Sequence, residues 1–303
     1  MPTGPRLPHR VRPARRSVGL LAVALLLVAV AGSCSEDEVD PLITARPYEL
    51  HLPPDHQNRE RAPLLVLLHG YGQTASLVTQ YFDMFPATDA HRMIVAAPEG
   101  TVDERGKQYW HATAACCGPA DSTVDDVAYL RAVVEDVRRQ YLVDPTRIYF
   151  MGHSNGGFMS YKMACEASDI VAAVISLNGA MTVGEPCDPT EPVAAVEIHG
   201  TGDEIILYAG GDWKESSAAY MGAADSAQAW QKINGCDPAP EQPPPAGHEI
   251  AVGLPPVEVT AYGDCRPGGR AELWSQPGAN HQPELTPGFG EATVGFLLGH
   301  PKP

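Results

Sequence analysis

Basic residues are scarce in this 303-residue sequence, which has 21 lysines and arginines against 37 aspartates and glutamates. Five of the arginines and none of the acidic residues lie in residues 1–33. Without that segment the formal net charge falls from −16 to −21, because 16 basic residues then face 37 acidic ones. Such a surface will not bind nucleic acid by neutralising phosphates. It also argues against polyanionic substrates and anionic membrane surfaces as partners.

A membrane-spanning run is also missing, because the apolar run over residues 18–31 is shorter than the ~20 residues that a span needs. It follows the five arginines and precedes Gly-Ser-Cys, an order that predicts an export signal over residues 1–33. Ala-Gly-Ser-Cys resembles a bacterial lipoprotein signal, in which the cysteine becomes the lipid-bearing first residue. Two alternatives stay open, cleavage alone and cleavage with lipidation of Cys34. Residues 34–45 predict an acidic tether, and the protein is expected outside the cell or in the cell envelope.

Metal-binding cysteine patterns are absent as well, since no cysteine pair has zinc-finger spacing and an adjacent pair is a poor start for a tetrahedral site. Apart from Cys34, the cysteines are Cys116, Cys117, Cys165, Cys187, Cys236 and Cys265. An even number in an exported chain predicts three disulfides, although six cysteines allow about fifteen connectivities.

The proline-rich stretch over residues 237–256 suggests one of these disulfides. Cys236 and Cys265 bracket this stretch, and we expect them to form a disulfide that closes it. The remaining four cysteines would form two bonds, in an order that the sequence leaves open: Cys116 and Cys117 separately with Cys165 and Cys187.

Apolar runs of strand length alternate with helical patterns through the rest of the chain. The predicted strands cover residues 63–68, 93–97, 148–150, 170–175, 192–198 and 271–275. The predicted helices cover residues 125–142, 158–163, 217–233 and 289–299. Residues 101–123 and 237–256 are expected to be loops. Near-continuous apolar strands between helices predict a single α/β domain over residues 46–303, with a mostly parallel sheet covered on both faces.

Ser154 lies between Gly152 and Gly156, at the point where a predicted strand becomes a predicted helix. Glycines at both positions let the strand and the helix approach closely. The Gly-x-Ser-x-Gly spacing in this context predicts a nucleophile elbow, with the serine at a helix N-terminus that favours negative charge. The alternative is an ordinary Gly/Ser loop, and the flanking patterns favour the elbow.

A serine nucleophile needs a base, and the base needs an orienting acid. Asp203 follows the predicted strand over residues 192–198, and His281 follows that over residues 271–275. Functional groups collect at the carboxyl ends of parallel strands, and the order serine, aspartate, histidine is that of α/β-hydrolases. The rivals considered for these two roles are His153, His199, His248, His300 and Asp212.

The charge that develops on a carbonyl oxygen needs N–H donors. One is expected from the backbone of Asn155 and one from the backbone of Tyr71, in the His-Gly-Tyr-Gly that follows the first predicted strand. The alternative for this tetrapeptide is a simple turn at a strand end. We expect Tyr71 and Trp110 to contact substrate, while core packing beside the Cys116–Cys117 pair is an equally good interpretation of Trp110.

Several of these motifs occur together. They are His-Gly-Tyr-Gly, Trp110 with Cys-Cys-Gly, Asp-Asp-Val at 125–127, Asp-Pro at 144–145, Gly-His-Ser-Asn-Gly-Gly and His-Gly-Thr-Gly-Asp at 199–203. Over roughly residues 45–300 the combination resembles the polyhydroxybutyrate depolymerase and feruloyl esterase family of α/β-hydrolases. The resemblance implies an exported serine esterase with no metal or organic cofactor, with Ser154 as nucleophile, Asp203 as acid and His281 as base. The family often has Trp-Pro soon after the histidine, where this chain has Gln282-Pro283. That tryptophan would help line the acyl pocket, so the resemblance implies the mechanism more strongly than the substrate.

The leading hypothesis is therefore an exported serine esterase. A serine peptidase or acyltransferase with the same triad, and a binding lipoprotein with an inactive site, are the alternatives. The expected partners are small or oligomeric esters, including polysaccharide-linked ones, with no nucleic acid and with membrane contact only through a lipid on Cys34. Because the sheet pattern fills residues 46–303, we expect no separate polymer-binding module and poor attack on solid polyester.

Overall fold

The computed structural model describes Met1 and residues 40–303, except residues 55, 120 and 214–215. The predicted export signal, the lipidation of Cys34 and residues 35–39 of the predicted tether lie outside the described residues. Residues 41–45, which the sequence assigns to the tether, instead form helix α1 (Pro41–Ala45) and bury Ile43. No helix in the described part of the chain is long and apolar enough to cross a membrane.

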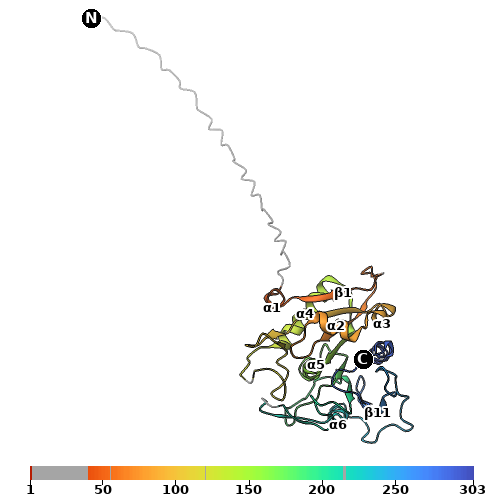
Figure 1. Ribbon diagram of the computed structural model, residues 1–303. Helices are drawn as coiled ribbons and strands as arrows, with labels where there is room; N and C mark the ends of the chain where they lie inside the picture. The colour runs from red at the N-terminus through yellow and green to blue at the C-terminus, as the bar shows by residue number, and fades with distance from the viewer. Residues whose placement is uncertain (2–39, 55, 120, 214–215) are drawn as a thin grey trace. The chain divides into compact units, whose positions relative to one another are not determined.

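The central sheet has eight strands within the described residues, in the order β1-β3-β2-β6-β7-β8-β12-β11. Their bounds are Tyr48–His51 (β1), Ala62–Leu68 (β2), Ile94–Pro98 (β3), Val143–His153 (β6), Ala173–Leu177 (β7), Ala194–Gly200 (β8), Glu258–Tyr262 (β11) and Arg270–Gln276 (β12). Strands β3, β2, β6, β7, β8 and β12 run parallel, and the two edge strands β1 and β11 are antiparallel to their neighbours. Figure 1 shows β1 and β11 on opposite sides of the folded domain.

Helices cover both faces of this sheet, because the central strands are apolar on both sides. Along β2, Leu64 and Val66 pack into one core, and Leu65 and Leu67 pack into the other. The first core is shared with α4 (Asp126–Gln140), α5 (Asn155–Glu166) and α6 (Ala223–Ile233). The second is shared with α2 (Ala75–Phe82), α3 (Phe85–Ala90) and α7 (Pro287–Gly299). The prediction of a mostly parallel α/β domain is confirmed.

Two short strand pairs form outside the central sheet, the first of them within the loop predicted over residues 101–123. β4 (Thr101–Val102) pairs with β5 (Gln108–Tyr109), and β9 (Gly211–Asp212) pairs with β10 (Ala219–Tyr220). The second pair takes up residues that the sequence assigns to a helix starting at 217. Helix α6 therefore starts six residues later than predicted, after Gly222.

The disulfides follow the predicted pattern only in part. Cys236 and Cys265 are joined, as predicted, and close the proline-rich stretch. Cys165 at the end of α5 is bonded to Cys187, with 5.0 Å between their Cα atoms. The adjacent Cys116 and Cys117 are bonded to each other, so the predicted cross-pairing is wrong. The partners expected for them already lie within disulfide reach of one another, and Cys117 has a positive φ of 80° that turns the chain back at this point.

Candidate active site

Ser154 stands between the last residue of β6 and the first residue of α5. Its backbone has φ 55° and ψ −120°, a conformation that residues with a side chain rarely adopt. Its N–H donates to Leu177 O at 2.8 Å, at the end of the neighbouring strand β7. A Cβ at Gly152 would overlap the carbonyl of Gly156, and a Cβ at Gly156 would overlap the carbonyl of Leu68. The sharp turn therefore depends on both glycines, as the sequence pattern predicts.

Asn155, the first residue of α5, is held by two hydrogen bonds. Its side-chain Oδ1 accepts from Trp110 N at 2.7 Å, and its Nδ2 donates to Trp110 O at 3.0 Å. The first N–H groups of a helix have no carbonyl one turn earlier to accept from them, and the helix dipole makes this end positive. The N–H of Asn155 is therefore suitable as a donor to a developing oxyanion.

Trp110 does not line the substrate surface, which corrects one of the two expectations for it. Its side chain is fully buried, and its Nε1–H donates to His69 O at 2.9 Å. Its indole ring stacks on Tyr129, with 6.5 Å between the ring centroids. Because its backbone also binds Asn155, Trp110 braces the loop at residues 69–72 against the start of α5.

Asp203 and His281 are in contact. His281 Nδ1 donates to Asp203 Oδ2 at 2.7 Å, across the ends of the adjacent strands β8 and β12. The other oxygen, Oδ1, accepts from the backbone of Ile205 at 2.8 Å and of Ile206 at 3.0 Å. Burial alone would raise the pKa of Asp203, but hydrogen bonds from His199 and His281 outweigh it and hold this pKa well below its usual range. The acid is therefore ionised at neutral pH.

The rival residues considered from the sequence lie elsewhere. Asp212 is exposed in β9, and His248 packs against Trp274, with 4.7 Å between the ring centroids. His300 Nδ1 contacts the carbonyl of Phe296 at 2.8 Å. None of these three contacts the acid, so the geometry favours the predicted aspartate and histidine.

His281 is also tied to the elbow through its own backbone. Its carbonyl accepts from Asn178 Nδ2 at 2.7 Å and from His153 Nε2 at 2.8 Å. Asn178 Oδ1 in turn accepts from Gly200 N at 2.9 Å, at the end of β8. Because His153 is the residue before Ser154, the carboxyl ends of β6, β7 and β8 together position the loop that contains the histidine.

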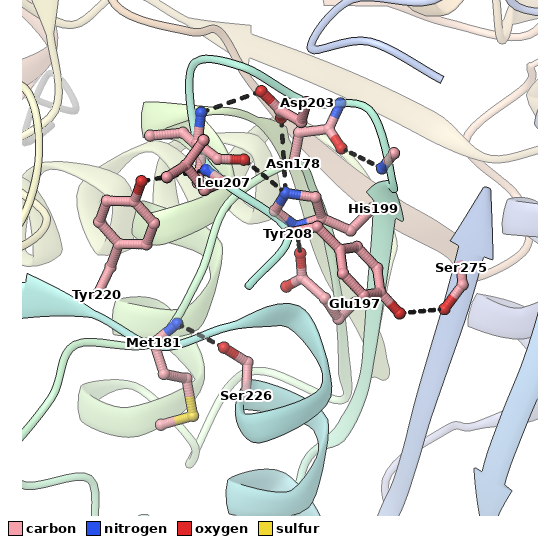
Figure 2. A network of polar contacts seen from close by, with 12 residues as sticks. Asn178, Met181, Glu197, His199, Asp203, Leu207, Tyr208, Tyr220, Ser226 and Ser275 are labelled. Carbon is pink, nitrogen blue, oxygen red and sulfur yellow. Dashed lines mark hydrogen bonds and ion pairs between the residues drawn. The ribbon is translucent and has the colours of Figure 1, made fainter. Parts of the chain in front are cut away.

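A second histidine, His199, is the second-last residue of strand β8 and lies on the side of Asp203 away from His281 (Figure 2). Its Nδ1 is 2.9 Å from Glu197 Oε1, and its Nε2 is 2.8 Å from Ile206 O and 3.5 Å from Asp203 Oδ2. Tyr161 on α5 donates to Glu197 Oε2 at 2.7 Å. Burial lowers the pKa of His199, but its hydrogen bonds to the two carboxylates and the Glu197 charge raise it to about 9. His199 is therefore charged at neutral pH.

Two further buried histidines lie on the Ser154 side of the candidate site. His69 Nδ1 is 2.8 Å from Gly70 O, and its Nε2 accepts from Gly100 N at 2.9 Å. His153 donates from Nε2 to His281 O, and its Nδ1 has no hydrogen-bond partner among the described residues. Burial lowers the pKa of His69 to about 4 and that of His153 to about 3. Both are therefore neutral under ordinary conditions.

A cavity of about 430 Å³ opens between the predicted oxyanion loop and the turn that follows Asp203. Its lining residues are Tyr71, Arg105, Cys117, Glu204, Ile205, Leu207, Asp212, Trp213 and Tyr220. The Tyr71 hydroxyl is held by Asp103 at 2.6 Å, so its ring has a defined place in the wall. Ile205 and Leu207 are 50% and 44% exposed, and the Cys116–Cys117 disulfide contributes Cys117. The cavity is thus largely apolar, with two carboxylates and the Arg105 guanidinium at its wall.

A second cavity, of about 920 Å³, lies between the proline-rich stretch and α7, and its lining includes none of the predicted site residues. Across the described residues, no group of three or more histidine, cysteine, aspartate or glutamate side chains is arranged to hold a metal ion. The smaller cavity beside Asp203 is therefore the candidate substrate site.

Comparison with known proteins is consistent with this geometry. The family model described as "Esterase PHB depolymerase" matches residues 46–216. Feruloyl esterase B of Piromyces equi is 29% identical over 227 residues, which cover 73% of this chain and 39% of that protein. "Probable feruloyl esterase C" of Aspergillus niger is 28% identical over 211 residues, 68% of each. The chain thus spans about two fifths and about two thirds of the lengths of these two relatives.

Among solved structures, the acetyl xylan esterase from Aspergillus awamori superposes with a TM-score of 0.58 at 15% identity. The match covers 82% of this chain and 93% of that one. At this level of identity the similarity concerns the fold alone, and it confirms the predicted α/β-hydrolase architecture.

Proposed function

The chain belongs to the esterase PHB depolymerase family, and we propose that it is an exported carboxylic-ester hydrolase that works through Ser154, His281 and Asp203. The observation that carries the proposal is the 2.7 Å hydrogen bond between His281 and Asp203, at the sheet edge where the Ser154 elbow also lies. Disulfides, which form and persist in oxidising compartments, support export. The same proposal includes cleavage after residue 33, with or without lipidation of Cys34.

The reaction begins when neutral His281 accepts the proton of Ser154 Oγ and the oxygen attacks the ester carbonyl. The backbone N–H groups of Asn155 and Tyr71 donate to the oxyanion that forms. His281 returns the proton to the leaving alkoxide, which leaves an acyl-enzyme. Water then attacks the acyl carbon, and His281 takes its proton. The bond to Ser154 Oγ breaks as His281 gives that proton to the serine oxygen, and the carboxylic acid product is released. Asp203 stays ionised throughout and stabilises the imidazolium.

The substrate is a neutral ester with a small acyl group that enters the cavity beside Tyr71. A volume of about 430 Å³ is in the range for small-molecule sites, and its apolar wall suits a short acyl chain or an aromatic ring. Glu204 and Asp212 in that wall, together with the excess of acidic residues in the chain, disfavour polyanions. Short hydroxyalkanoate oligomers and hydroxycinnamoyl or acetyl esters on plant polysaccharides meet these conditions.

The decisive experiment replaces the nucleophile. Ser154→Ala should remove hydrolysis of p-nitrophenyl acetate and labelling by a fluorophosphonate, with a loss in kcat on the order of 10⁶, while the protein stays folded. Ser168→Ala, a buried serine beyond the end of α5, is the matched control and should keep both. Turnover like that of the wild type in Ser154→Ala would overturn the proposal.

The base is tested in the same assay. His281→Gln should remove activity at every pH, because no neutral imidazole is left to take the serine proton. His248→Gln should keep it, and the reverse result would identify the wrong histidine. A panel of soluble 3-hydroxybutyrate oligomers, methyl ferulate, acetylated xylan and solid polyhydroxybutyrate then ranks the substrates. Fast clearing of the solid polymer with little turnover of the soluble esters would contradict the preference for soluble esters.

A further inference from the structure

We infer that His199 is a positioning residue for the catalytic acid, which holds both the Asp203 carboxylate and the turn that carries it, and so governs the rate and the pH dependence of turnover. The inference rests on the proposed function, because it assigns His199 a role through Asp203 and His281. His199 is not one of the residues that touch the reacting atoms.

The protonation of one ring nitrogen follows from its neighbours. Nε2 of His199 faces the carbonyl of Ile206 at 2.8 Å and Asp203 Oδ2 at 3.5 Å. Both are acceptors only, so Nε2 must carry a hydrogen. The same Ile206 donates its N–H to Asp203 Oδ1 at 3.0 Å. The turn over residues 203–206 is thus closed by the acid on one side and by His199 on the other.

The second step concerns Asp203 Oδ2, the carboxylate oxygen that accepts the hydrogen bond from His281. Asp203 Oδ2 accepts from His281 Nδ1 at 2.7 Å and faces His199 Nε2 at 3.5 Å. One carboxylate oxygen therefore lies between two imidazoles, in close contact with one and at longer range with the other. A donor on the far side limits how far this oxygen can rotate away from His281.

The third step is that His199 is itself anchored. Its Nδ1 faces Glu197 at 2.9 Å (Figure 2). Glu197 in turn takes a hydrogen bond from Tyr161 on α5. The ring of Tyr208 packs edge-on against the His199 ring, with 5.7 Å between the ring centroids. Burying the Glu197 carboxylate and the His199 imidazole in an otherwise apolar strand costs free energy of desolvation. That free energy is offset only when both groups are paired. Helix α5, which starts at the nucleophile, thus reaches the acid through Tyr161, Glu197 and His199.

The charge of His199 also bears on the base. The ionisable groups that face His199 are Glu197, Asp203, Tyr161 and, from the loop, Tyr208. Those that face His281 are Asp203 and the neutral His153. Removing the His199 cation leaves the Glu197 carboxylate uncompensated and leaves Asp203 with His281 as its one imidazole partner. His281 should then hold its proton to higher pH.

The experiment uses three substitutions at one position in the full chain. The amide nitrogen of Gln can stand near Nε2, whereas that of Asn can stand only near Nδ1, and Leu offers neither. His199→Leu and His199→Asn should lower kcat for p-nitrophenyl acetate by about 10- to 100-fold, with a smaller change in KM, since a base displaced by about an ångström costs rates of this size. His199→Gln should recover most of kcat. All three should move the midpoint of the kcat/KM profile to higher pH, because all lack the charge.

The control is His51→Gln, which changes another histidine–carboxylate pair, with Asp89 at 2.7 Å, on the opposite edge strand. It should leave kcat and the pH profile unchanged. If His199→Leu fails to fold, the Gln and Asn variants carry the test. Equal kcat in these two, with a wild-type pH profile in both, would overturn the inference. Failure of the proposed function is a separate outcome, in which the wild-type protein shows no hydrolysis that depends on Ser154.

Discussion

The two sides of the candidate site hold their buried histidines in opposite charge states. On the nucleophile side, at the ends of β2 and β6, His69 and His153 are neutral, with pKa values near 4 and 3. On the acid side, at the end of β8, His199 has a pKa of about 9. All three are almost fully buried, so depth alone does not decide the charge.

The charge state of each buried histidine is decided by the groups that face its ring nitrogens. On the nucleophile side each ring has one close acceptor: His69 faces a carbonyl at 2.8 Å and an N–H at 2.9 Å, with the Glu99 carboxylate farther away at 3.8 Å, and His153 faces one carbonyl. On the acid side both nitrogens of His199 face acceptors, and two carboxylates are among them. The close partners of the histidines are therefore dipoles on the nucleophile side, and include two carboxylates on the acid side. A cation beside the oxyanion loop is avoided, while a cation behind Asp203 keeps that acid ionised.

Neutralising the acid side should have the largest effect. Asp203→Asn removes the charge that orients and stabilises the His281 imidazolium, and kcat should fall by about 10⁴. The assay is steady-state hydrolysis of p-nitrophenyl acetate. Asp212→Asn changes the rival acid, which lines the candidate substrate cavity, and it should retain activity within a few-fold. An equal loss in both variants would remove the distinction between the two aspartates.

The pH dependence of stability should separate the two sides. Between pH 6.5 and 4 the unfolded chain binds protons at His69 and His153 that the native protein does not bind. These two histidines should therefore lower the free energy of unfolding as pH falls, by about 2.7 kcal/mol per pH unit. Glu197, whose pKa burial raises, offsets part of this. Between pH 6.5 and 9 only the native protein keeps the His199 proton. Stability should therefore fall as pH rises, by about 1.4 kcal/mol per unit.

Urea unfolding across this pH range measures both limbs. His199→Gln should flatten the alkaline limb and leave the acid limb, and His153→Gln should reduce the acid limb alone. An alkaline limb that persists unchanged in His199→Gln would mean that His199 is not charged in the native state.

A smaller effect concerns the brace on the nucleophile side. Trp110→Phe removes the 2.9 Å hydrogen bond from the indole to His69 O, whose net contribution is about 1 kcal/mol. Trp230→Phe is the matched control, because Trp230 is equally buried and its indole nitrogen has no partner among the described residues. The difference in urea midpoint between the two variants isolates the hydrogen bond. No difference would show that the brace contributes packing alone.

The central strands could be predicted because parallel strands buried on both faces are continuous apolar runs. The edge strands β1 and β11 were missed, since each is short and partly exposed and has no such run. Helix α3 was missed as well, because its six residues contain a proline and no apolar period. Local patterns thus reveal the interior of the sheet better than its margins.

At the site, the sharp turn at Ser154 and the placing of Asp203 and His281 after neighbouring strands could be predicted, because each residue follows a recognisable strand. The sequence treats His199 only as a rival base. Glu197 and His199 are two apart in a strand that is otherwise apolar, which puts them on one face and requires each to find a buried partner. That signal was available. The Cys116–Cys117 bond and the burial of Trp110 depend on long-range packing, which no local pattern contains.

The crowding around Gly152 and Gly156 has a consequence for laboratory evolution of this protein. Every amino acid that could replace either glycine carries a Cβ, which would collide with backbone carbonyls that have nowhere to move. Randomising these codons would therefore yield misfolded clones almost exclusively. Ile205, Leu207 and Trp213, by contrast, already carry side chains that line the cavity. A search for new substrate preferences should place its diversity there and keep the elbow constant.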